Sequence, residues 1–315
     1  MAGSQAWRHA DRDISKRNQL DDRAFSPRPP ADSRPRSPAR SHASAHSVTC
    51  GRASRPPTTT PSPASPVCVL PWVRDGFQKN VTISIVIPAR NEALQIRENV
   101  LRLIRDAEQV FSAHDWRIVI AENGSSDETA VIAETLAAGL PNVSARHCMR
   151  PGKGGAIREA WDASRADVLA FLDADLAADA QQLNHVIAGL ADADLAIGSR
   201  RLSQSRPTRS PIRRVVSAVF HAIARQLVDI PVADAQCGCK AMRAQAWQQL
   251  SAHISHDGFL FDTELIARAH RANMRIAEIP IVWNDATRSG RGSVRLWRDS
   301  WKMFIGLLGL RRALR

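Results

Sequence analysis

The sequence predicts an α/β fold with a mostly parallel central sheet, preceded by a disordered tail. Short apolar runs at 83–87 and 168–172 are typical of strands that are buried on both faces. Between these runs, apolar residues recur at helical spacing over 96–111. Strands that alternate with helices in this way form βαβ units, in which successive strands are parallel.

The remaining elements continue this order along the chain. In the first half we expect strands at 116–121 and near Val143, helices at 130–138 and 156–164, and a glycine-rich loop at 152–155. In the less regular second half we expect strands at 195–198 and 275–283 and helices at 212–228, 262–272 and 294–314. Open α/β sheets bind ligands beyond the carboxyl ends of their strands, so the loops that follow the strands are the candidate site.

Residues 1–66 have the composition of a disordered segment. They hold 10 of the 18 prolines and carry a net charge of +6, from 11 Lys/Arg and 5 Asp/Glu. The segment is either a basic tether for a membrane or nucleic acid, or a solvated tail or upstream sequence that is not natively translated. We therefore divide the chain into a tail, 1–78, and a folded domain, 79–315, which ends in a basic amphipathic helix.

Charge and cysteine content narrow the class of protein. A net charge of +12 suggests an acidic partner: nucleic acid, an anionic membrane surface or a phosphate-bearing substrate. No recognisable nucleic-acid-binding motif accompanies the charge and tyrosine is absent, so nucleic acid is not the expected partner. Five cysteines, an odd number in a long chain, predict reduced thiols in a cytoplasmic setting. We expect neither a signal peptide nor a membrane-spanning helix.

Two aspartates follow the strand predicted at 168–172. In an extended conformation Asp173 and Asp175 would project to the same side of the chain. Paired carboxylates suit Mg²⁺ or Mn²⁺, which would bridge the two phosphates of a nucleotide-sugar. Acidic turns are common, so the prediction depends on the position of this one after a buried strand.

Two polar loops follow neighbouring strands. Segment 150–155 opens a helix, so its free backbone N–H groups and Lys153 could bind an anion, although it lacks the phosphate-loop pattern of nucleotide hydrolases. Segment 122–127 offers donors and acceptors suited to a base or ribose. Its Asp127 could instead cap the following helix.

Taken in order, these motifs resemble the family 2 inverting glycosyltransferases. Within that family the chain is most similar to polyprenyl-phosphate sugar transferases of the dolichyl-phosphate β-glucosyltransferase type. The resemblance spans about residues 83–315, with motifs at 85–92, 121–125, 152–158, 171–176, 198–200, 234–240, 261–265 and 298–300. It implies a GT-A fold, which is a Rossmann-like nucleotide-sugar-binding fold, with a UDP-sugar or GDP-sugar donor and a divalent cation.

The resemblance also implies roles for individual residues. The nucleotide-sugar would contact residues of the first four motifs, namely Pro88, Ala89, Asn91, Glu92, Glu122, Asn123, Lys153 and Asp173. Asp173 and Asp175 would hold the metal ion, and the acceptor phosphate would contact Arg200, Arg213, Arg214 and Lys240. Two positions depart from the pattern, because Glu122-Asn123 replaces a pair of aspartates and Cys239 replaces a phenylalanine.

The predicted reaction is an inverting, metal-dependent hexose transfer to a polyprenyl phosphate. UDP-glucose is the preferred donor and GDP-mannose the next. A phosphate acceptor is already ionised near neutral pH, whereas a hydroxyl acceptor would need a general base, for which Asp234 and Asp262 are the catalytic candidates. A family member that acts on a non-lipid hydroxyl, or a non-catalytic adaptor that binds sugar nucleotides, is the alternative.

Two basic helices could contact the acceptor or its membrane. The helix at 294–314 combines an apolar face with basic residues, which suits the plane of an anionic membrane but also a helix packed on the domain. Arg213 and Arg214 open the helix at 212–228 and would form either a clamp for the lipid phosphate or an ordinary solvated surface. We expect a cytoplasmic protein that is at most peripheral on the cytoplasmic face of a membrane.

Overall fold

The computed structural model describes residues 81–208, 211–284 and 296–314, all of which belong to the unit Pro66–Arg315. For 207–208, 211–219 and 296–302 it describes the backbone elements and not the side chains. The predicted tail, 1–78, lies outside the described residues.

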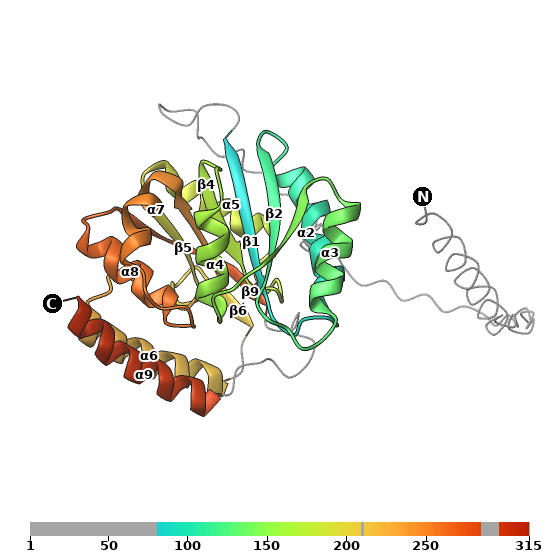
Figure 1. Cartoon of the computed structure of the whole chain (residues 1–315). Helices are drawn as coiled ribbons and strands as arrows, with labels where there is room; N and C mark the ends of the chain where they lie inside the picture. The colour runs from blue at the N-terminus through green and yellow to red at the C-terminus, as the bar shows by residue number, and fades with distance from the viewer. Residues whose placement is uncertain (1–80, 209–210, 285–295, 315) are drawn as a thin grey trace, which may run out of the picture. The chain divides into compact units, whose positions relative to one another are not determined.

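A seven-stranded sheet forms the centre of this unit, in the order β3-β2-β1-β4-β7-β5-β8 (Figure 1). Its first four strands are parallel: β3 (Val143–His147) at the edge, then β2 (Asp115–Glu122), β1 (Thr82–Ala89) and β4 (Val168–Leu172). At the other edge, β5 (Leu195–Ser199) and β8 (Ile276–Pro280) are parallel to each other. The predicted α/β class and the mostly parallel sheet are confirmed.

One strand runs against its neighbours. β7 (Cys239–Arg243) lies between β4 and β5 and is antiparallel to both. The sequence analysis missed it, because the segment is short, contains Lys240 and has no β-branched residue. Antiparallel pairing puts the start of β7 beside the end of β4, with Cys239 opposite Leu172.

The single strand predicted over 275–283 is wrong, because the chain forms two strands there. β8 ends at Pro280, and β9 (Val282–Asn284) pairs in parallel with β6 (Arg206–Thr208) in a separate two-stranded sheet. Proline has no N–H to donate to a ladder, so Pro280 is a natural point for the chain to leave the central sheet.

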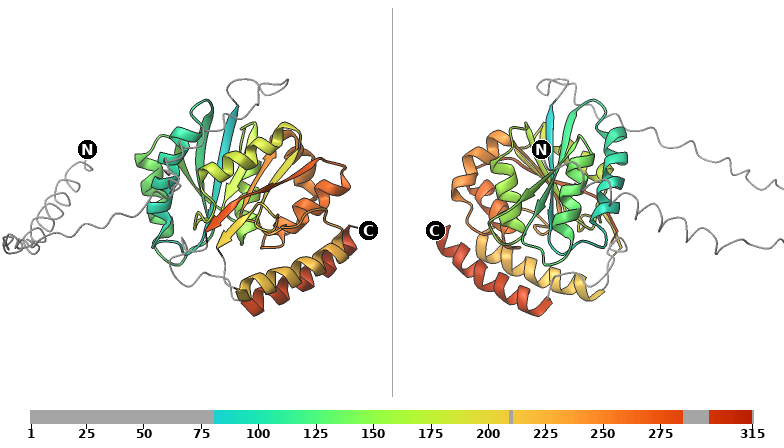
Figure 2. Two further views of the ribbon diagram at one scale, coloured as in Figure 1. Left: turned by 180° about the vertical axis from the view of Figure 1, so that it is seen from behind. Right: turned by 45° about the vertical axis from the view of Figure 1, so that its right-hand side comes forward.

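Helices cover both faces of the central sheet (Figures 1 and 2). On one face, α2 (Ile96–Val110), α3 (Thr129–Gly139) and α5 (Ala180–Ala188) share a core with alternate residues of β1, namely Ile83, Ile85 and Ile87. On the other face lie α4 (Lys153–Asp162), α7 (Ala244–Leu250) and α8 (Phe261–Arg271), around a core that includes Trp161 and Phe171. Short 3-10 turns, Gly189–Ala191 and Ser251–His253, extend α5 and α7.

Two long helices, α6 (Pro211–Val228) and α9 (Leu296–Ala313), run side by side (Figure 2). The helices predicted at 212–228, 262–272 and 294–314 are confirmed, whereas α5 and α7 were not predicted. Among the described residues, no helix has the length and apolar character needed to cross a membrane. Cys148, Cys237 and Cys239 are free thiols.

The start of α4 differs from the prediction of a loop over 152–155. The helix begins at Lys153, and Gly152 precedes it with φ +103°, a backbone conformation that glycine tolerates best. A Cβ on Gly154 would lie within 2.9 Å of the carbonyl oxygens of His256 and Gly258. The glycines therefore let the first turn of α4 pack against the loop before α8.

Candidate active site

The predicted donor-binding residues gather at the carboxyl-terminal ends of the parallel strands. β1 and β2 end in register, with Ala89 beside Glu122, and β4 ends at Leu172 in the same sheet. The start of β7 lies beside the end of β4. The loops after β1, β2 and β4 and the segment before β7 therefore meet at one place, as expected for a ligand site in an open α/β sheet.

The loop after β1 is fastened to the loop after β2. Asn91 has φ +57° and its Oδ1 accepts a hydrogen bond from the Ser126 N–H (2.8 Å). The Glu92 N–H donates to Thr129 Oγ1 (2.8 Å). Ala89 is buried, and its carbonyl oxygen accepts from the Asn123 N–H (3.0 Å). Pro88, next to it, is half-buried, so these residues shape the loop around the candidate donor site.

Asn123 fastens the loop after β2 to the start of α4. Its Nδ2 donates to the Arg150 carbonyl oxygen (2.5 Å), and its Oδ1 accepts from the Gly152 N–H (2.5 Å). An ionised aspartate has no donor for the first of these bonds. The departure from the family's paired aspartates therefore has a structural function in this chain.

The expectation of free N–H groups before and within the first turn of α4 is wrong for two of these groups. The Gly152 N–H is used by Asn123, and the Gly155 N–H donates to the Asp257 carbonyl oxygen (2.8 Å). These two donors bind the protein's own oxygens, because the glycine-rich segment packs between two loops. The Lys153 side chain is thus the main feature of this segment that reaches the site.

Glu122 is buried and held by two donors. The Ser125 N–H donates to its Oε1 (2.5 Å), and His147 Nδ1 lies 3.1 Å from its Oε2. His147 also contacts Glu134, through Nε2 at 2.8 Å. Hydrogen bonds to Glu122 and then Glu134 raise the pKa of His147. Burial alone would raise the pKa of Glu122, but these hydrogen bonds lower it, so Glu122 is a carboxylate.

Four charged side chains form a continuous chain of ion pairs. Lys153 Nζ lies 2.8 Å from Asp173 Oδ1 and 3.4 Å from Asp262 Oδ2. Lys240 Nζ lies 2.6 Å from Asp262 Oδ1 and also donates to the Cys237 carbonyl oxygen (2.6 Å). The Lys240 and Asp262 side chains are 0% and 1% exposed, whereas that of Asp173 is 33% exposed. The chain of ion pairs thus runs from the core to the site.

Electrostatics keep Lys153 and Asp173 ionised. Burial of Lys153 would lower its pKa, but the carboxylates of Asp173 and Asp262 raise it above the usual value. Burial of Asp173 would raise its pKa, but the Lys153 ammonium group lowers it. The candidate metal-binding carboxylate is therefore negatively charged near neutral pH.

A second buried ion pair joins two predicted site residues. Arg200 Nε and Nη2 donate to the two carboxylate oxygens of Asp234, at 2.6 and 2.8 Å, and the Arg200 N–H donates to Asp234 Oδ2 (3.0 Å). The Arg200 guanidinium also lies over the Trp283 ring, 4.8 Å from its centroid. Burial of Asp234 would raise its pKa, but Arg200 lowers it.

These ion pairs bear on the predicted general bases. Asp234 is fully paired with Arg200, and both oxygens of Asp262 contact ammonium groups. Arg200 lowers the pKa of Asp234, so this carboxylate is a weak base. The general-base role of Asp234 and Asp262 stays a prediction that this geometry does not favour.

The Asp173-Ala174-Asp175 segment is a tight turn, so the extended conformation assumed for it is wrong. The Leu176 N–H donates to the Asp173 carbonyl oxygen (3.0 Å), and Asp175 Oδ1 accepts from the Ala177 N–H (3.2 Å). Leu176 has φ +44°. The turn follows directly from β4, so both carboxylates stay at the end of that strand.

The donor chemistry fits a divalent cation that is completed by substrate. Among the described residues, no group of three or more His, Cys, Asp or Glu side chains could hold a metal ion by itself. Mg²⁺ in proteins is commonly bound by one or two carboxylates together with substrate phosphates. Asp173 and Asp175 match that pattern, and Asp173 is partly exposed.

The structure describes the side chains of only some of the residues predicted to contact the acceptor. Lys240 is fully buried and pairs with Asp262, so this structure does not favour the predicted contact of Lys240 with the acceptor phosphate. Arg213 and Arg214 lie in the first turns of α6, but their side chains are outside the described part of the chain. The structure therefore brings Arg200 and Lys240 to the region of Asp173 and leaves the other two predictions as they stand.

Gly238 is a site residue that the sequence analysis did not single out. Its carbonyl oxygen accepts from the Asp173 N–H (3.0 Å), and a Cβ on it would overlap the Asp173 carboxylate. Only the quoted motif at 234–240 carried a signal for it. Trp283 and His147 were also missed, because neither belongs to a motif.

We expect Gly238→Ala to reduce sugar transfer about 10²-fold, because the new methyl group must displace the Asp173 carboxylate. Initial rates with a labelled donor would measure the effect. Gly139→Ala is the matched control, since a Cβ there meets nothing within 4 Å. Equal rates for the two variants would contradict the placement of Asp173 in the site.

The fold and the acidic turn after β4 define a GT-A architecture. The family model "Glycosyl transferase family 2" matches residues 84–250, which is more than half of the chain. The chain belongs to glycosyl transferase family 2, as the motifs predicted.

Individual proteins agree with this assignment. The chain is 34% identical over 222 residues to glycosyltransferase AglD of Haloferax volcanii, covering 70% of this chain and 35% of AglD. It thus spans about a third of that relative's length. It is 27% identical over 239 residues to dolichyl-phosphate beta-glucosyltransferase ALG5A of Trichomonas vaginalis, covering 72% of this chain and 74% of that protein.

A solved structure supports the fold. Glucosyl-3-phosphoglycerate synthase from Mycobacterium tuberculosis, in complex with Mn²⁺, UDP-glucose and phosphoglyceric acid, aligns with a TM-score of 0.56 at 21% identity. The alignment covers 76% of this chain and 86% of that one. At this identity the likeness concerns the GT-A fold alone.

Proposed function

We propose that this protein transfers a hexose from a nucleotide-sugar to a polyprenyl phosphate with inversion at the anomeric carbon. The observation that carries the proposal is the pairing of both candidate bases, Asp234 with Arg200 and Asp262 with two lysines. A site whose carboxylates are already paired suits an acceptor that needs no deprotonation. A phosphate is such an acceptor, and the relatives named as dolichyl-phosphate glucosyltransferases support it.

The reaction is a single displacement. An oxygen of the acceptor phosphate forms a bond to the anomeric carbon while the bond from that carbon to the nucleotide diphosphate breaks. Lys153, which lies 2.8 Å from Asp173, offsets the negative charge of the leaving diphosphate. Asn91, Glu92 and Glu122 shape the loops that receive the nucleotide.

A divalent cation, Mg²⁺ or Mn²⁺, would be held by Asp173 and Asp175. When bound, it would supply positive charge to the diphosphate of the donor. UDP-glucose is the proposed donor, and GDP-mannose is the next candidate. The structurally similar synthase was solved with Mn²⁺ and UDP-glucose bound, so the shared fold can accommodate this metal and donor.

The acceptor lipid suggests a membrane surface beside the site. In the described part of α9, Ile305 and Leu308 are 54% and 40% exposed, and Arg311 and Arg312 are exposed near its end. Exposed apolar and basic side chains on one helix favour peripheral binding to an anionic membrane. α6, which carries Arg213 and Arg214, runs beside it.

The deciding experiment incubates the full chain with labelled UDP-glucose or GDP-mannose and polyprenyl phosphate, with and without Mn²⁺. We expect metal-dependent label in the organic phase with UDP-glucose. Label in that phase with GDP-mannose alone would replace the proposed donor. Transfer only to a water-soluble hydroxyl acceptor, or donor binding without any transfer, would overturn the proposed reaction.

A further inference from the structure

A concave surface lies on the sheet face that α4 only partly covers. Alternate residues of each strand share a face, and the strand register aligns Ser84 with Arg117, Val119 with Ser144, and Ala121 with Arg146. Val86, Ala121 and Leu169 on this face are buried beneath α4 and its neighbours. Towards β3 the same face changes from apolar side chains to hydroxyl and guanidinium groups.

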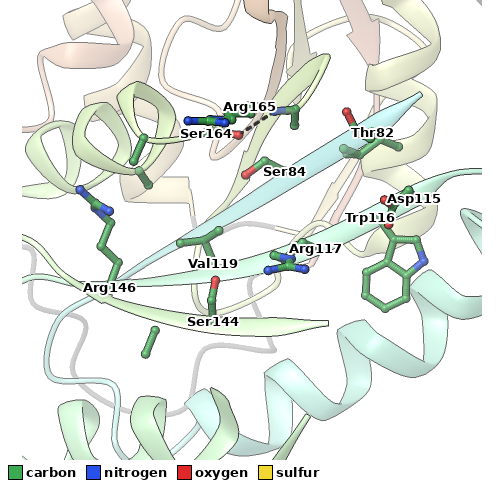
Figure 3. Close-up of a pocket in the computed structure, with 15 residues that line it drawn as sticks. Thr82, Ser84, Asp115, Trp116, Arg117, Val119, Ser144, Arg146, Ser164 and Arg165 are labelled. Atoms are coloured by element: carbon green, nitrogen blue, oxygen red, sulfur yellow. Dashed lines mark hydrogen bonds between the residues drawn. The ribbon is translucent and has the colours of Figure 1, made fainter. Parts of the chain in front are cut away.

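This surface forms an open pocket of about 490 Å³, hereafter the arginine pocket. The end of α4 and the loop after it supply one wall, with Ser164 and Arg165, and β1, β2 and β3 supply the floor. Figure 3 shows Arg117, Arg146 and Arg165 arranged around Ser84, Val119 and Ser144. The volume lies in the range that small-molecule sites occupy.

The charges of the arginine pocket are uncompensated. Its ionisable lining residues are Arg117, Arg146, Arg165 and Asp115, a net charge of +2 (3 − 1). Over 81–208, 211–284 and 296–314, none of these three arginines forms an ion pair or a side-chain hydrogen bond. Three guanidinium groups from three separate elements are suited to a ligand with more than one negative charge.

Ser84 adds a hydrogen-bonding group to the arginine pocket. It is 5% exposed, it lines the arginine pocket, and its hydroxyl has no hydrogen-bond partner among the residues that the structure describes. Its Oγ keeps contact with solvent, so the hydroxyl is available to a ligand in the pocket.

We propose that the arginine pocket binds a small, multiply charged anion of the phosphomonoester or diphosphate class. The guanidinium groups would contact its phosphate oxygens, and the Ser84 hydroxyl would donate to it from the floor. Residues 1–66 carry a net charge of +6, so charge complementarity disfavours the chain's own basic segment as the occupant. The pocket is separate from Lys153 and Asp173, which lie at the carboxyl ends of the strands.

The test titrates the full chain with inorganic pyrophosphate in EDTA by isothermal calorimetry. We expect the Arg117→Ser/Arg146→Ser variant to weaken one binding event about tenfold, which is the combined loss of two exposed charge contacts. Ser84→Ala should weaken the same event several-fold and leave the thermal midpoint unchanged, because its hydroxyl has no partner to lose. Lys153→Ala should leave this event intact.

Arg97→Ser/Arg105→Ser is the matched control. Both arginines are exposed on α2, so the variant removes the same charge away from the pocket, and we expect wild-type binding of pyrophosphate. An equal loss of pyrophosphate binding in this control would show that net charge alone explains the effect, and it would overturn the proposal. Absence of any pyrophosphate binding, or binding that Lys153→Ala alone abolishes, would overturn it as well.

Discussion

An Asp175→Asn protein should lose sugar transfer by about 10²-fold or more, with its fold intact. Asp175 Oδ1 accepts a hydrogen bond from the Ala177 N–H, and an asparagine oxygen can accept the same bond. The substitution therefore preserves the turn after β4 while it removes the negative charge proposed for the metal ion and donor diphosphate. Metal-dependent rates with labelled donor would measure the loss.

Asp179→Asn is the matched control for this variant. Asp179 lies four positions further on, is exposed, and caps α5 by accepting a hydrogen bond from the Gln182 N–H (2.9 Å). Asparagine caps helices about as well as aspartate, so the control loses the same charge and keeps its structure. Wild-type turnover and an unchanged metal response in Asp175→Asn would refute the proposed use of the Asp173-Ala174-Asp175 turn.

Removal of the Asp262 carboxylate should cause the largest loss of stability. Asp262→Ala leaves the fully buried Lys240 ammonium without its carboxylate partner, and Lys153 loses its second one. Breaking a buried ion pair from one side typically costs about 3–5 kcal/mol, because the remaining charge stays desolvated. Chemical denaturation would measure the fall in the free energy of unfolding.

A double variant distinguishes charge from packing. Asp262→Leu/Lys240→Met removes both members of the pair, and we expect it to recover much of the lost stability. Glu134→Ala, which breaks the exposed contact between Glu134 and His147, should cost less than about 1 kcal/mol. A loss below 1 kcal/mol for Asp262→Ala would show that water reaches Lys240 and that the ion-pair chain is not buried as described.

The half of the fold that holds the candidate donor site could be predicted well from the sequence. β1 and β4 are buried on both faces, so each is a continuous apolar run, and α2 has one apolar face. β7 could not be found in this way, because its alternate residues include Lys240, whose burial depends on a carboxylate from α8. Local composition carries no information about such a distant partner.

The candidate site, too, could be predicted only in part from the sequence. The positions of Glu122, Lys153 and Asp173 at the ends of strands follow from element order alone. Their contacts do not, since the pairing of Arg200 with Asp234 joins residues that are 34 positions apart in sequence. The turn at Asp173 was missed because the strand before it was assumed to continue. The start of α4 was placed too late because its glycines suggested a loop.

The antiparallel strand has a consequence for how this enzyme family could vary. β5 and β7 pair like the two arms of a hairpin, with Ile197 opposite Lys240, so the long excursion from 200 to 238 leaves and re-enters the sheet at adjacent points. An insertion with neighbouring ends can be lengthened, shortened or exchanged without moving the strands that flank it. This excursion holds α6, Asp234 and Gly238, whereas the loops after β1, β2 and β4 lie outside it. An exchange that keeps Gly238, which contacts Asp173, and the pairing of β6 with β9 could therefore replace the segment proposed to face the acceptor and leave the candidate donor site unchanged.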